Sequence, residues 1–219
     1  MPTTPPPNPA DPADGTIAVS GTGRVAVVPD TADLRLGLSV ARPSVDAARM
    51  EAAGIMEAIL RAVDAAGVAR RDVRTTLLSV QPRYDYRDGK APTLTGYELA
   101  NAVEVTIRDL ARLGDVVDGV LKAGATSMDG LSFRSSDPAP AEREARHAAM
   151  ADARSRADVL AEAAGLAIVG VADIIEGNLA MSPGPQFKAD RVVMAEASTP
   201  IETGTTEIAV TVAVTYRAR

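Results

Sequence analysis

The sequence predicts an α+β protein built on two consecutive β-α-β units, and three observations carry that prediction. Apolar and polar residues alternate over 31–41 and 207–217, which is typical of strands with one exposed face. Over 45–66 apolar residues recur every three or four positions, as in an amphipathic helix. The order strand, helix, strand occurs twice, at 31–84 and 96–135. Two such units joined by a hairpin usually form one antiparallel or mixed sheet packed by helices.

The opening segment predicts two strands, at 16–28 and 31–41. Gly21-Thr22-Gly23 interrupts the first, which indicates a bulge or kink in a long strand. Pro29-Asp30 predicts a turn between the two strands.

The rest of the first unit is a helix and a strand. Ser44 is suited to cap the helix, and Gly67 is suited to end it. A strand follows at 73–84, and a polar turn at 87–90 connects it to a strand at 95–108. These two strands predict a long hairpin.

The second unit ends with a helix at 110–123 and a short strand at 129–135. An Ala-rich helix follows at 141–164, and strands follow at 169–175 and 207–217. We expect these last elements to extend the same core, because the helix has an inward stripe of mostly small residues. That stripe is Ala141, Ala145, Ala149, Ala153, Ala157, Leu160 and Ala164. Three pairs of opposite charge stand four residues apart on its exposed sides: Glu142 with Arg146, Asp152 with Arg156, and Arg154 with Asp158.

The chain is predicted to be a single domain over 15–219, preceded by a disordered Pro-rich tail at 1–14. Residues 177–206 form a long loop rich in proline and glycine that also contains apolar residues. Loops of this length are usually functional or disordered. We expect this loop to pack on the same domain, with docking on a neighbouring subunit as the alternative.

Composition excludes several classes of function. The formal charge of −6 argues against nucleic acid as a partner, because a phosphate backbone attracts clustered Lys and Arg. Cysteine is absent, which removes disulfides and thiolate chemistry. His147 is the only histidine, and a surface position on the Ala-rich helix is favoured for it. Accordingly, we expect no metal and no cofactor.

The N-terminal segment and the hydropathy bear on location. Residues 1–14 lack the basic start and apolar run of a secretory signal, which predicts a cytoplasmic protein. No stretch reaches the roughly eighteen apolar residues of a membrane span, so we expect a soluble chain.

No catalytic motif in the sequence singles out an active site. Gly21-Thr22-Gly23 opens a stretch matching the letters of a dinucleotide fingerprint, but Val25 and Val27 continue a strand where the fingerprint needs a helix. The candidate functional residues are therefore ones that could bind a partner. They are Tyr84, Tyr86 and Tyr97 around the hairpin, and Phe187 and Met194 in the long loop. For the tyrosines, packing between neighbouring strands is the alternative explanation.

Four pieces in order resemble the SIMPL domain family. They are the segment from Gly21-Thr22-Gly23 to Ala32, the strand with Thr95-Gly96-Tyr97, the Ala-rich helix over 153–165, and Thr199-Pro200-Ile201-Glu202 before the last strand. The resemblance covers about 17–216. It implies an opening hairpin, and a protein that is exported, associated with the bacterial envelope and linked to oxidative-stress defence, in some cases as a large oligomer. Export would require a true start upstream of Met1.

Two hypotheses about function follow. The first is a noncatalytic assembly or binding protein that forms a homo-oligomer, with a ligand that the sequence does not identify. The alternative is an enzyme that uses carboxylates or tyrosines in a cleft covered by the loop at 177–206.

Overall fold

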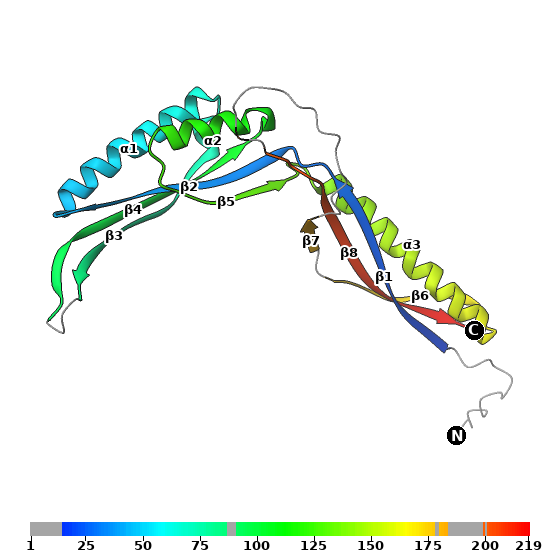
Figure 1. Ribbon diagram of the computed structural model, residues 1–219. Helices are drawn as coiled ribbons and strands as arrows, with labels where there is room; N and C mark the ends of the chain where they lie inside the picture. The colour runs from blue at the N-terminus through cyan, green and yellow to red at the C-terminus, as the bar shows by residue number, and fades with distance from the viewer. Residues whose placement is uncertain (1–14, 87–90, 178–179, 184–198, 200) are drawn as a thin grey trace, which may run out of the picture. The chain divides into compact units, whose positions relative to one another are not determined.

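The computed structural model describes residues 15–86, 91–177, 180–183, 199 and 201–219. Within these ranges the chain has the predicted α+β class, with two antiparallel four-stranded sheets and three α-helices (Figure 1). The described residues group into two compact units, each with its own apolar core. The sheet B unit holds described residues of 28–136 and 188–204, and the sheet A unit those of 1–27, 137–187 and 205–219. Each unit is described by itself.

The sheet B unit contains the two predicted β-α-β units. Its strands lie in the order β3-β4-β2-β5, and all neighbours are antiparallel. Helices α1 and α2 pack on one face of this sheet (Figure 1). The prediction of one sheet packed by helices is therefore confirmed for this part of the chain. In chain order the elements are β2 (Thr31–Arg42), α1 (Val45–Ala65), β3 (Val73–Asp85), β4 (Thr93–Ile107), α2 (Leu113–Lys122) and β5 (Ser127–Arg134).

The helices of this unit begin and end where their sequences predict. The hydroxyl of Ser44 accepts a hydrogen bond from the backbone N–H of Ala47 and so caps α1. Gly67 follows the helix with φ of +87°, a conformation that favours glycine. The predicted helix at 110–123 starts as a 3-10 turn at Leu110–Arg112, which the carboxylate of Asp109 caps through the N–H of Ala111.

The core of the sheet B unit forms where two strands present apolar residues in register. Leu34 lies opposite Val105, and Leu36 lies opposite Val103, on the face covered by the helices. Ile59 of α1 is fully buried against this face. Burial of such aliphatic side chains stabilises the fold by about 1.5–3 kcal/mol each.

The sheet A unit is built around the last strand. In it, β8 pairs with β1 along the whole of both strands on one side, and with β6 and β7 on the other. Helix α3 packs on β1 and β8 and covers one face (Figure 1). The remaining elements therefore form a second sheet, and the expectation that they extend the first core is wrong. They are β1 (Gly15–Val27), α3 (Ala139–Ala164), β6 (Ile168–Glu176), β7 (Ala180–Pro183) and β8 (Thr206–Ala218).

The predicted opening hairpin is also wrong, because β1 and β2 belong to different sheets. The expected turn residue, Asp30, binds residues far along the chain. Its backbone N–H donates to the carbonyl of Arg134, and its carboxylate accepts from the N–H and the hydroxyl of Ser136. Asp30 therefore lies beside the end of β5.

The glycines of β1 do not form a bulge. Gly21 pairs with Val212 and Gly23 with Val210 in an unbroken register. Their role is close approach to α3: a Cβ on Gly21 would lie 2.1 Å from the carbonyl oxygen of Ala149, and one on Gly23 would lie 1.9 Å from that of Ala145. Only glycine leaves room for the helix backbone at these two positions.

The predicted stripe of α3 is largely confirmed. Its buried residues are Ala145, Ala149, Ala153, Ala157 and Ala161. Leu160 is 49% exposed and Ala164 is also exposed, because the stripe continues in steps of four and Ala161 takes the inward position. All three predicted charge pairs of this helix form, at 2.9 to 3.5 Å, and His147 is exposed as expected.

Parts of the predicted long loop are described. Residues 180–183 form β7 on sheet A, and Ile201 packs against the apolar core of the sheet B unit. The hydroxyl of Thr199 donates to Asp118 of α2 at 2.9 Å. This end of the loop packs on its own chain, as expected. The N-terminal tail at 1–14 and the hairpin turn at 87–90 lie outside the described residues.

Candidate functional site

The hairpin end of sheet B brings the three candidate tyrosines into one region. Tyr84 and Tyr86, at and just beyond the end of β3, have ring centroids 6.3 Å apart with the planes tilted by 59°. Tyr84 is 45% exposed and Tyr86 is 72% exposed. Tyr97 of β4 is half-buried and lines the same depression as Tyr84. Phe187 and Met194 lie outside the described residues.

This depression has a volume of about 460 Å³ and is lined by polar and aromatic groups. The side chains that line it include two guanidinium groups, a carboxylate and two phenol rings, from Arg42, Arg83, Asp85, Tyr84 and Tyr97. Such a surface can hydrogen-bond and stack against a polar or peptide group.

A close backbone approach shapes the floor of this depression. Gly96 has φ of +149°, and a Cβ there would lie 2.6 Å from the carbonyl oxygen of Arg42. The guanidinium of Arg42 also pairs with Glu51 of α1. These contacts hold the ends of β2 and β4 against the start of α1.

The edge of β3 carries functional candidates that the sequence analysis did not single out. Leu77, Leu78 and Val80 are 47%, 68% and 43% exposed, although they lie within a strand. The register shifts between Thr75 and Leu77 and is regular from Leu77 on, so the adjacent leucines face opposite sides of the sheet as successive strand residues do. The sequence does carry one signal of this exposed apolar edge: apolar residues fall on both faces of strand 73–84, so neither face is wholly polar.

An apolar groove lies between α1 and β3 on the helix side of sheet B. It has a volume of about 190 Å³, and its walls include Leu60 of α1 and Val73 of β3. The buried side-chain oxygen of Asn101 on β4 has no hydrogen-bond partner among the described residues, and Asn101 pairs in register with Leu78. Helix α1 covers β2 and β4, so the helix-side residues of β3 remain accessible.

The carboxylates of this unit are held in ion pairs. Burial raises the pKa of Asp33, but hydrogen bonds from Arg134 and Thr106, each 2.6 Å, outweigh it and hold the pKa below its usual value. The guanidinium of Arg108, 2.8 Å from Asp72, lowers the pKa of that carboxyl. These groups are ionised at neutral pH and orient the ends of the strands.

Glu104 is likewise held in ion pairs, by two neighbouring arginines. Hydrogen bonds from Arg35 at 3.1 Å and Arg74 at 2.7 Å lower the pKa of Glu104. The three side chains form a ladder across β2, β4 and β3 on the face of sheet B away from the helices. This ladder ties the edge strand to the rest of the sheet.

The described part of the chain contains neither a candidate metal site nor a candidate membrane-spanning helix. There, no three His, Cys, Asp or Glu side chains come together in a way that could hold a metal ion. None of the helices in those residues is both long enough and apolar enough to cross a bilayer.

Two groups of relatives resemble the chain. A "26 kDa periplasmic immunogenic protein" of Brucella melitensis is 33% identical over 210 residues, covering 91% of this chain and 83% of the relative. The "Uncharacterized protein YggE" of Escherichia coli K12 is 35% identical over 145 residues, covering 66% of this chain and 58% of the relative.

The family comparison extends over almost all of both units. Residues 17–216 match SIMPL, described as a protein of unknown function (DUF541). This range runs from the start of β1 to near the end of β8. The chain therefore belongs to the SIMPL family.

Proposed function

We propose that this protein is a noncatalytic assembly and binding protein that forms a homo-oligomer through the β3 side of sheet B. The observation that carries the proposal is the exposed apolar edge of β3, continued by Tyr84 and Tyr86 at the hairpin. Unpaired strand edges with apolar side chains readily accept another strand, and most proteins protect them with charges.

The electrostatics favour binding over acid–base catalysis. A general acid at neutral pH needs a carboxyl pKa raised towards 7. The pKa values of Asp33, Asp72 and Glu104 all lie below their usual values, because arginines hydrogen-bond to these carboxylates. Such carboxylates are suited to fixing structure.

The cellular setting follows from the relatives. One carries the name periplasmic immunogenic protein, which supports a role in the periplasm for this chain too. The names of these two relatives give no support to the cytoplasmic location that the sequence predicts. We place the protein in the bacterial envelope, and we keep the link to oxidative-stress defence as part of the proposal. Loss of the gene should then lower survival of the parent bacterium in peroxide, and equal survival would remove that link.

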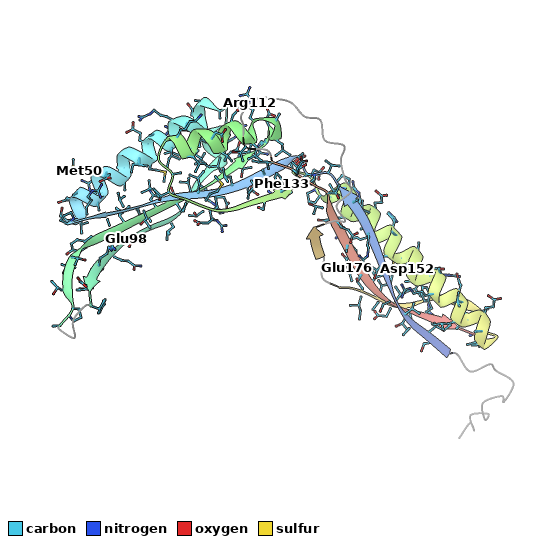
Figure 2. The ribbon with its side chains drawn as sticks, viewed as in Figure 1. Met50, Glu98, Arg112, Phe133, Asp152 and Glu176 are labelled. Atoms are coloured by element: carbon cyan, nitrogen blue, oxygen red, sulfur yellow. The ribbon has the colours of Figure 1, made fainter. Side chains whose placement is uncertain are left out.

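The experiment that tests assembly is size-exclusion chromatography with light scattering on the full chain. A discrete mass above 22.6 kDa is expected, and the double variant Tyr84→Ala with Tyr86→Ala should shift it downwards. Met50→Ala is a control, since Met50 is an exposed apolar residue on α1 (Figure 2). A monomeric full chain would refute the assembly.

A further inference from the structure

We propose that the edge of β3 pairs with the edge of β6 from a second copy, so that identical subunits join head to tail. The inference rests on the proposed assembly and names its contact. Among the described strands, β3 pairs only with β4, and β6 pairs only with β8. Each therefore presents one unpaired row of backbone donors and acceptors.

The other two sheet edges are less suited to such pairing. At the edge of β1, the backbone N–H of Thr22 already donates to the carboxylate of Asp152 on α3, at 2.9 Å. The edge of β5 carries one exposed large apolar residue, Met128. Strand pairing by a second copy would gain little apolar burial at either edge.

Exposed apolar side chains concentrate on β3 and β6. Of the seventeen large apolar side chains that are exposed among the described residues, eight lie on these two strands. They are Leu77, Leu78, Val80 and Tyr84 on β3, and Val169, Val171, Ile174 and Ile175 on β6. Exposed apolar residues gathered on edges mark surfaces that are covered in an assembly.

The charges of the two strands are complementary. β3 carries Arg74, which pairs with Glu104, and Arg83, with Asp85 at its last position, and Arg70, Arg71 and Asp72 precede it. The charged residues of β6 are Asp173 and Glu176 alone, and Glu176 pairs with Arg146 of α3 at 2.9 Å. Pairing β6 with β6 would bring like charges together, whereas pairing β3 with β6 brings opposite charges together.

Register irregularities limit where the strands can meet. The pairing of β3 with β4 is regular over 77–83, and that of β6 with β8 is regular over 173–176. Pro82 lacks a backbone N–H. Residues 77–81 are therefore the regular part of β3 in which every residue has an N–H to donate. The contact is therefore a short ladder of four or five residues. In it, Leu78 and Ile174 both lie on the helix-covered side of their sheets.

A head-to-tail contact predicts a specific mixing result. Leu78→Lys should block the β3 edge, and Ile174→Lys should block the β6 edge, because a charge on an edge strand opposes pairing. Each variant alone should be a monomer. Mixed in equal amounts, they should form a 1:1 dimer, because one intact edge of each kind remains. Analytical ultracentrifugation over a concentration series measures this, and circular dichroism checks that both variants fold.

Met50→Lys provides the matched control, since Met50 on α1 is 68% exposed, as is Leu78. It should leave the wild-type mass unchanged. If Ile174→Lys still assembles while Leu78→Lys does not, β3 meets another surface and this inference is wrong, although assembly through β3 stands. If Leu78→Lys assembles like wild type, both this inference and assembly through β3 are wrong. A monomeric wild type would refute the proposed function itself.

The absence of cysteine allows a second measurement. A Val80→Cys chain and an Ile174→Cys chain, mixed and oxidised, should give mainly the mixed disulfide dimer. A Met50→Cys chain mixed with the Ile174→Cys chain should not. A predominance of dimers of the Val80→Cys chain with itself would overturn the head-to-tail contact and show pairing of β3 with β3.

Discussion

Single residues set the helix-to-sheet distance in the sheet A unit. Gly21 and Gly23 lack the Cβ atoms that would collide with backbone atoms of α3, and a collision with backbone cannot be relieved by a side-chain rotation. The letters Gly-x-Gly in a strand are compatible with a bulge or with close packing. The choice between them depends on an element more than a hundred residues later in the chain, which is why local sequence could not make it.

Gly21→Ala should lower the free energy of unfolding by about 1–3 kcal/mol, because the added methyl group overlaps the backbone of α3. Gly54→Ala is the matched control, since a Cβ at Gly54 on α1 meets nothing within 4 Å. It should stabilise the protein by about 0.5–1 kcal/mol. Urea unfolding measures both, and equal effects of the two changes would contradict the close-packing role.

A second prediction at this scale concerns acid. The folded-state pKa of Asp33 lies below its usual value, so its ionised form stabilises the fold above about pH 3.9. That contribution is lost as the pH falls through the folded-state pKa. Asp33→Asn should therefore be less stable than wild type at pH 7, with a difference that shrinks towards pH 3. Glu57→Gln, which changes an exposed ion pair on α1, should stay within about 0.5 kcal/mol of wild type in the same urea series.

At the scale of elements, the boundaries and caps of the helices follow from local sequence. Ser44, Gly67 and the three charge pairs of α3 act within a few residues of the chain, so one sequence is enough to find them. Pairing of β1 with β8 is not local, and an alternating strand fits either sheet equally well. The tyrosine cluster could be predicted from the hairpin. The exposed apolar edge of β3 could not be predicted, because the exposure of its side chains depends on where α1 packs on the sheet.

The alanine stripe of α3 gives the prediction for this scale. Ala149 is fully buried against β1, whereas its neighbour Ala148 is exposed. Ala149→Leu should destabilise the protein by about 1–3 kcal/mol or more, because the larger side chain forces the helix away from β1. Ala148→Leu should stay within about 0.5 kcal/mol of wild type. Thermal denaturation compares the two, and similar melting temperatures would argue against a tightly packed stripe.

At the scale of the whole molecule, two apolar cores share no residue. One contains Ile59, and the other contains Ile208, and both side chains are almost fully buried. The single domain that the sequence predicts stays a prediction. Composition and length could not reveal the division, since both cores have the same amino-acid character.

Truncating each core should therefore act locally. Ile59→Ala and Ile208→Ala should each cost about 2–5 kcal/mol in their own unit. Hydrogen exchange followed by mass spectrometry should show faster exchange mainly over 31–134 for the first, and mainly in β1, β6 and β8 for the second. Equal acceleration in both regions would support one cooperative domain.

The pairing of β1 with β8 has a consequence for biosynthesis. Of the described strands, the one translated first pairs with the one translated last, from Gly15 with Ala218 to Val27 with Thr206. Until β8 has been synthesised, β1 and β6 both lack the strand that lies between them in the sheet. The strands and helices of 31–134 can meanwhile assemble. A nascent chain thus carries an unfinished sheet A until β8 appears, a state that remains open to chaperones and to passage through a translocation pore.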